Sequence, residues 1–111
     1  MELKTHTFPG GVTVVHPIGR LDLTAAAEFK QRLSLTIAEG QLRLVVDLAE
    51  VSFIDSSGLG ALISSLKAAR LAGGDLRIAR PSDQARVILQ LTALERVFHP
   101  FARLEDALAD Y

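Results

Sequence analysis

The stretch Asp55-Ser56-Ser57-Gly58-Leu59-Gly60 follows a short apolar run, residues 51–54, and opens a pattern of apolar residues at helical spacing. It therefore places two hydroxyl groups and two glycines where a helix begins, near Ser57. The first N–H groups of a helix lack intrahelical partners and carry partial positive charge, so this position suits a capping side chain or a phosphate. Glycine has no side chain, so we expect a low surface on which a second protein can approach the serines closely.

The composition is typical of one globular domain, which we expect to span residues 1–111, with 49% apolar and 23% charged residues. The net charge of -1 argues against a nucleic-acid binder that works by neutralising phosphates. Cysteine is absent, which excludes disulfides and thiolate zinc sites. The sequence shows neither a basic-then-apolar leader nor an apolar run of membrane-spanning length. We therefore expect a cytoplasmic protein that does not insert directly into a membrane.

The first part of the chain predicts two strands, residues 3–8 and 12–18, joined as a hairpin and followed by a helix. Pro17 indicates an edge position or a strand end, because proline cannot donate a hydrogen bond to a sheet ladder. The helix begins near Asp22 or Thr24, either of which can cap it.

The rest of the chain alternates strands and helices. The expected elements are a buried strand at 42–48, a helix from 57 to about 73, a short strand at 76–79, a helix opened by Pro81-Ser82, a last short strand at 97–98 and a helix at 104–108. Alternation of this kind implies right-handed crossovers and a largely parallel sheet. With the N-terminal hairpin added, the prediction is an α/β fold built on a small mixed β-sheet.

Two helix faces are predicted from residue type. On the helix after Pro81-Ser82, the apolar side is expected to carry Val87, Ile88 and Leu91. On the helix after Ser57, the exposed side is expected to be flat and weakly charged, which suits either docking or plain solvation. Its residues are Ala61, Ser64, Ser65 and Ala68.

Three roles are open for Ser56 and Ser57. The commonest is a helix cap, which contributes about 1 kcal/mol. A phosphate at the same place would add about -1.5 to -2 charges and abolish a protein contact without unfolding the domain. A catalytic serine would need a G-x-S-x-G elbow, which is absent, and a base. None of His6, His16 and His99 is spaced to indicate such a base.

Nucleotide and carboxylate chemistry are disfavoured as well. The pair Gly58-x-Gly60 lacks the third glycine of a dinucleotide fingerprint and the Gly-Lys-Ser/Thr of a phosphate loop. Asp22 and Asp55 both follow predicted strands, so we expect them to share one end of the sheet. For Asp22, a helix cap and a partner contact remain equally open. We therefore expect no enzyme activity and no cofactor.

Taken together, these residues resemble the STAS domain of bacterial anti-sigma factor antagonists. The serine motif is preceded by Asp47-Leu48-x-x-Val51-x-Phe53-Ile54, which extends the match. Gly19-Arg20-Leu21-Asp22 is similar to the family's second short motif, and Gly73-Gly74-x-Leu76 to its later turn and strand. The resemblance covers essentially the whole chain. It implies a STAS fold with about four helices packed mainly on one face of the sheet.

The resemblance also implies a function in partner switching without catalysis by this chain. The implied partner is an anti-sigma factor that is also a serine kinase and supplies the ATP; binding it releases a sigma factor. The kinase would phosphorylate Ser56, and a serine phosphatase would reset it. The implied partner-binding residues are Asp22, Asp55, Ser57, Gly58, Leu59 and Gly60.

Two points remain open within this resemblance. Many members carry an acidic residue where this chain has Arg20, and such a charge reversal changes which kinase is favoured. The alternative that keeps the fold is a non-catalytic STAS adaptor or scaffold, on a transporter ATPase subunit or in a stress-sensing complex.

Overall fold

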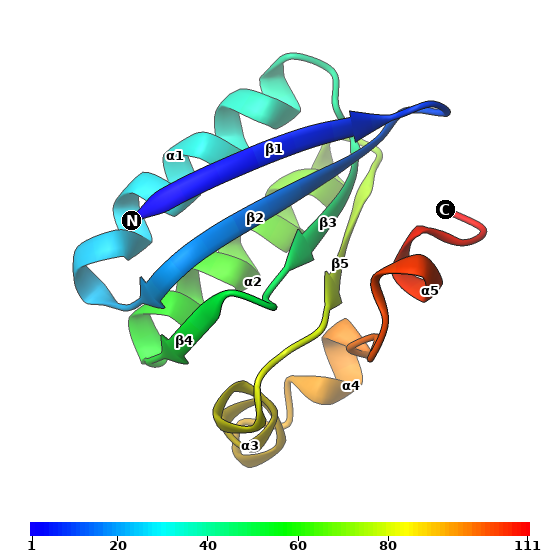
Figure 1. Ribbon diagram of the computed structural model, residues 1–111. Coiled ribbons are helices and arrows are strands. Elements are labelled where there is room, and N and C mark those ends of the chain that lie inside the picture. Colours follow the sequence, from blue (N-terminus) through cyan, green and yellow to red (C-terminus); the bar gives the residue numbers. More distant parts are fainter.

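The computed structural model describes residues 1–111 and contains five strands and five helices (Figure 1). In chain order these are β1 (Glu2–Phe8), β2 (Val12–Leu21), α1 (Leu23–Ala38), β3 (Arg43–Asp47), β4 (Val51–Ile54), α2 (Ser56–Leu71), β5 (Asp75–Ala79), α3 (Asp83–Leu91), α4 (Glu95–Phe98) and α5 (Leu104–Leu108). No helix combines the length and the hydropathy that a membrane span requires.

The five strands form one mixed sheet. Its order is β1-β2-β3-β5, and β4 pairs with the second half of β2. β1 is antiparallel to β2, whereas every other pair is parallel. The α/β class, the mixed sheet and the N-terminal hairpin are therefore confirmed.

Pro17 does not lie at an edge, because β2 is a central strand. On its parallel side β2 pairs first with β3, through residues 12–15, and then with β4, through residues 19–21. Pro17 lies between these two ladders, where a missing N–H costs little. The edge prediction was wrong because the sequence does not show that one strand has two successive partners on the same side.

The helices cover the two faces of the sheet unequally (Figure 1). α1 and α2 pack on one face and bury the main core, which includes Phe29, Leu33 and Leu62. On the opposite face α5 brings Ala107 against a smaller cluster with Val14 and other sheet residues. Most of the buried apolar surface, and hence most of the hydrophobic stabilisation, lies between the sheet and the α1–α2 pair.

Several local predictions need correction. Residues 97–98 belong to the helical turn α4, and the extended contact of this region is instead made by Phe101, which bridges to Ala79. On α3 the buried residues are Ala85 and Leu89. Of the three residues predicted on its apolar side, Ile88 is half-buried against the main core, whereas Val87 is 52% exposed and Leu91 is 81% exposed.

The predicted exposed face of α2 is also partly wrong. Ala61 and Ser65 are buried, Ala68 is half-buried, and Ser64 alone is fully exposed. The reason is that α2 packs against α1 as well as against the sheet, so two of its sides are covered. The small side chains of Ala61 and Ser65 therefore serve the packing of α2 inside the domain and not a surface for docking.

Candidate functional site

Two strands end and two helices begin at the same edge of the sheet. Leu21, the last residue of β2, lies opposite Ile54, the last residue of β4, in parallel register. Asp22 and Asp55 follow these strands directly, and each is the N-cap of the next helix. The prediction that the two carboxylates share one end of the sheet is confirmed. We call this edge, made of residues 20–24 and 53–60, the serine edge.

Asp22 caps α1 and is held on several sides. Its Oδ1 accepts hydrogen bonds from the backbone N–H of Thr24 at 3.1 Å and from the Thr24 hydroxyl at 2.7 Å. Its Oδ2 accepts a hydrogen bond from Nε of Arg20 at 3.3 Å. The Thr24 hydroxyl, with Arg20 as a lesser cause, lowers the pKa of Asp22 below its ordinary value. Asp22 is therefore a capping carboxylate that remains ionised at neutral pH.

Asp55 joins the two helix starts. Its Oδ1 accepts a hydrogen bond from the N–H of Gly58 at 2.9 Å, which caps α2. Its Oδ2 accepts one from the N–H of Leu23, the first residue of α1, at 3.1 Å. A single carboxylate thus satisfies an otherwise unpartnered donor on each helix and fixes their relative position.

The cap of α2 is therefore Asp55, and the interpretation of a serine as the cap is wrong. Ser56 and Ser57 are the first two residues of the helix, and neither side chain makes a hydrogen bond within the chain. Ser56 is exposed and Ser57 is half-buried. The Ser56 hydroxyl is thus an exposed group at a helix start, free of any structural role in the fold.

The two glycines of the motif differ in their surroundings. Gly58 is buried, and a Cβ built on it would lie 2.0 Å from the carbonyl oxygen of Leu21. The close approach that Gly58 permits is therefore that of α2 to the end of β2, not that of a second protein. Gly60 is exposed and has nothing within 4 Å of the position that a Cβ would take, while Leu59 is buried in the core. Of residues 57–60, only Ser57 and Gly60 reach the surface.

Arg20 is fixed beside Asp22. Its guanidinium lies 4.3 Å from the ring centroid of Phe53, the residue opposite it across the β2–β4 ladder. Cation–π contact and the hydrogen bond to Asp22 together hold the positive charge in one place. Sequence reasoning named both residues but did not predict their contact, because it did not predict that β2 pairs with β4.

Gln84 is a further residue that sequence reasoning missed. Its amide pairs with the edge of β4, accepting a hydrogen bond from the Ile54 N–H at 2.9 Å and donating one to the Ile54 carbonyl at 2.8 Å. The side chain thereby takes the place of a neighbouring strand just before Asp55. The sequence of α3 contains no pattern that predicts this contact. The contact links the serine edge to α3.

A buried carboxylate, Asp47, lies away from this edge at the end of β3. Asp47 accepts hydrogen bonds from Arg80 and from the N–H of Ala49, and its Oδ2 lies 3.0 Å from Nδ1 of His16. This contact with Asp47 raises the pKa of Arg80 above its ordinary value. His16 thus lies in contact with Asp47, beside the ion pair that Asp47 forms with Arg80.

Comparison with known proteins gives a consistent result. The sequence model of the STAS domain matches residues 4–107. The chain is 33% identical over 98 residues to the anti-sigma-F factor antagonist RsfB of Mycobacterium tuberculosis, covering 88% of this chain and 80% of that protein. It is 31% identical over 81 residues to the anti-sigma-B factor antagonist of Staphylococcus aureus, covering 73% of this chain and 75% of that protein.

The fold agrees with a solved structure as well. The crystal structure of a putative anti-sigma factor antagonist from Thermotoga maritima superposes with a TM-score of 0.89, at 23% identity, over 96% of this chain and 91% of that chain. At 23% identity the superposition shows only that the fold is shared. The family is shown by the match to the STAS sequence model and by the relatives above 30% identity. The chain therefore belongs to the STAS domain family.

Proposed function

We propose that this chain is an anti-sigma factor antagonist that binds an anti-sigma factor through the serine edge and is released by phosphorylation of Ser56. Two relatives above 30% identity carry the name of anti-sigma factor antagonist, which supports the class of function. The observation that carries the site is the exposed Ser56 hydroxyl, which begins α2 and makes no hydrogen bond within the chain.

Ser56 is favoured over Ser57 as the acceptor. Both lie in the first turn of α2, but only Ser56 is fully exposed, and a kinase must bring its ATP to the hydroxyl. Because the Ser56 hydroxyl stabilises nothing in the fold, a phosphate there replaces no internal contact. Ser57 lies one residue later on the same surface and is half-buried, so Ser57→Asp shows what a negative charge does at the neighbouring position.

A phosphate at Ser56 acts mainly on the surface that a partner meets. It adds about -1.5 to -2 charges directly after Asp55, on the edge of the sheet that also carries Asp22. Within the chain, the free N–H groups of the first turn of α2 favour the phosphate and offset repulsion from the two carboxylates. A partner surface arranged for a neutral hydroxyl has no such compensation. We expect a loss of about 3 to 4 kcal/mol, which weakens binding several-hundred-fold.

The remaining roles follow from this proposal. The anti-sigma factor acts as the serine kinase and supplies ATP, a serine phosphatase resets the chain, and the chain itself performs no catalysis. Asp22, Asp55, Ser57 and Gly60 lie at the contact surface. Gly58 and Leu59, which are buried, hold α2 in place beneath it. The exchange takes place in the cytoplasm.

The proposal is tested with paired baits in lysate of the source cell. Wild type, Ser56→Ala, Ser56→Asp and Ser57→Asp are used for affinity capture with mass spectrometry, followed by phosphosite mapping with ATP. We expect an ATPase-fold kinase on wild type and Ser56→Ala, its loss on Ser56→Asp, and phosphate on Ser56. Equal recovery of transporter subunits by wild type and Ser56→Asp would contradict the switch and support the adaptor alternative.

A further inference from the structure

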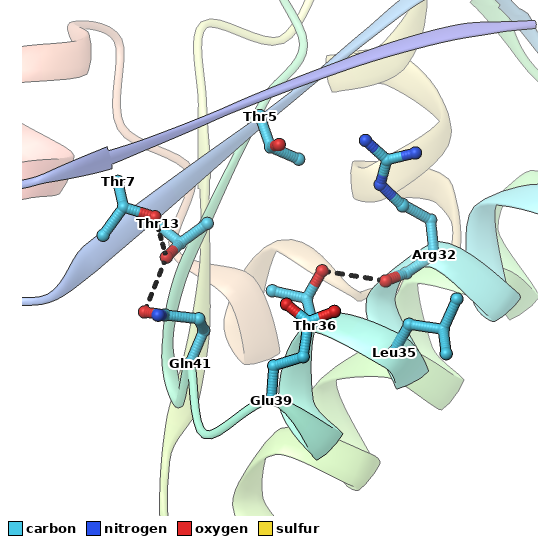
Figure 2. A pocket seen from close by; sticks show the side chains of 8 residues that line it. All are labelled: Thr5, Thr7, Thr13, Arg32, Leu35, Thr36, Glu39 and Gln41. Atoms are coloured by element: carbon cyan, nitrogen blue, oxygen red, sulfur yellow. Dashed lines mark hydrogen bonds between the residues drawn. The ribbon is translucent and has the colours of Figure 1, made fainter.

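A polar cavity of about 350 Å³ lies between the β1–β2 hairpin and α1, at the end of α1 remote from Asp22 (Figure 2). The hairpin contributes Thr5, Thr7 and Thr13, and α1 and the turn after it contribute the facing side chains. This cavity plays no part in the serine edge. Its volume is in the range of small-molecule sites.

Two of the polar lining residues, Thr13 and Thr36, lie where the fold elsewhere places core, whereas the other lining residues are exposed or half-buried. Val15, two residues along β2 from Thr13 and on the same face, belongs to the main core. Thr13 is nevertheless only 2% exposed, and Thr36 of α1 is only 8% exposed. Burying hydroxyl groups costs free energy unless they are hydrogen-bonded, so this lining is a specific feature and not a default of packing.

A chain of hydrogen bonds orients one amide in the cavity. The Thr7 and Thr13 hydroxyls lie 3.0 Å apart, and the Thr13 hydroxyl donates to Oε1 of Gln41 at 3.0 Å. Figure 2 shows the Gln41 side chain directed at Thr13. The Gln41 oxygen accepts this hydrogen bond, and the Gln41 NH₂ group donates none within the chain. The Thr5 hydroxyl is likewise unused.

Two opposite charges flank the same cavity without pairing. Arg32 and Glu39 both line it, and neither forms an ion pair in the structure. They are seven residues apart on one helix side, which places their Cα atoms about 10 Å apart along the axis. Figure 2 shows the Arg32 guanidinium extending from α1 toward the strand that carries Thr5.

We propose that this cavity binds a small zwitterion of dipeptide size. The ligand's carboxylate pairs with the Arg32 guanidinium and accepts a hydrogen bond from the Thr5 hydroxyl. Its ammonium pairs with Glu39, and the NH₂ group of Gln41 donates to the peptide carbonyl. An extended dipeptide spans about 7 Å, which fits between two charged side chains that reach inward from positions about 10 Å apart.

The test is a titration of the ¹⁵N-labelled chain with glycylglycine, read by NMR and calorimetry. We expect saturable shifts centred on the amides of Thr13, Thr36 and Gln41. Arg32→Gln and Glu39→Gln should each weaken binding at least about tenfold, as expected for loss of a charge-assisted contact. Lys30→Gln, on the same helix but outside the cavity, is the matched control and should bind like wild type.

Two blocked probes assign the charges. N-acetylglycylglycine lacks the ammonium and should bind Glu39→Gln as well as it binds wild type. Glycylglycinamide lacks the carboxylate and should bind Arg32→Gln as well as it binds wild type. The absence of saturable shifts at the cavity amides, or an equal loss of affinity in Lys30→Gln, would overturn the proposal.

Discussion

Replacing Gly58 with alanine should destabilise the domain, although alanine is the better helix former. The added Cβ would lie 2.0 Å from the Leu21 carbonyl oxygen and 3.1 Å from Cγ of the same residue. Because the nearest obstacle is backbone at the end of a central strand, α2 has to move away from β2. Overpacking of this kind costs about 3 kcal/mol, and the gain in helix propensity returns less than about 1 kcal/mol.

The matched control is Gly60→Ala. Gly60 lies in the same helix turn, and nothing lies within 4 Å of its Cβ position. Helix propensity then acts alone, and the change should stabilise the domain by about 0.5 to 1 kcal/mol. The two substitutions add the same methyl group, so their difference isolates the contact with Leu21.

The assay is reversible urea unfolding, with thermal unfolding alongside it. Gly58→Ala should lower the free energy of unfolding by about 2 kcal/mol and Tm by about 8 °C, while Gly60→Ala should raise Tm by a few degrees. Equal stability of Gly58→Ala and wild type would refute the reasoning, because it would mean that α2 does not need this close approach. Equal losses in both variants would refute it too.

Three further predictions concern other contacts. Asp55→Ala removes the cap of α2 and the hydrogen bond to the Leu23 N–H, so the free energy of unfolding measured in urea should fall by about 2 kcal/mol. An unchanged urea midpoint would contradict the bridging role of Asp55. Arg80→Ala leaves the buried carboxylate of Asp47 without its main partner, so the free energy of unfolding should fall by about 2 kcal/mol in the same assay. An unchanged free energy of unfolding would mean that solvent replaces the arginine and would contradict this role. Burial raises the pKa of Tyr111, the single tyrosine, from 10.0 to about 12, so phenolate absorbance should titrate near 12 in the folded chain. Since the unfolded chain loses this proton first, stability should fall between about pH 10 and pH 12; a midpoint at 10 would contradict the burial.

The sequence was sufficient for the serine edge in outline but not for its details. Asp22 and Asp55 could be placed at one end of the sheet because each follows an apolar run and precedes a helical pattern. The choice of cap was missed, although aspartate is as good a cap as serine and lies at the right place. Predicting Asp55 as the cap would have left Ser56 free from the start.

Other features depend on contacts far apart in the chain. β4 is only four residues long, and its partner is the second half of β2, so residues 51–54 read merely as an apolar run. The contact of Gln84 with Ile54 joins positions thirty residues apart. The burial of Ser65 follows from the packing of α2 on α1, which periodicity within one helix does not reveal.

The central claim is that phosphate on Ser56 strongly weakens binding of the anti-sigma factor while leaving the domain folded. The most direct measurement is calorimetric titration of the purified partner with chain phosphorylated stoichiometrically at Ser56, beside the unmodified chain, with Tm recorded for both. We predict several-hundred-fold weaker binding and a nearly unchanged Tm. Equal affinity of the two forms would contradict the switch, and a drop in Tm of many degrees would contradict a mechanism confined to the surface.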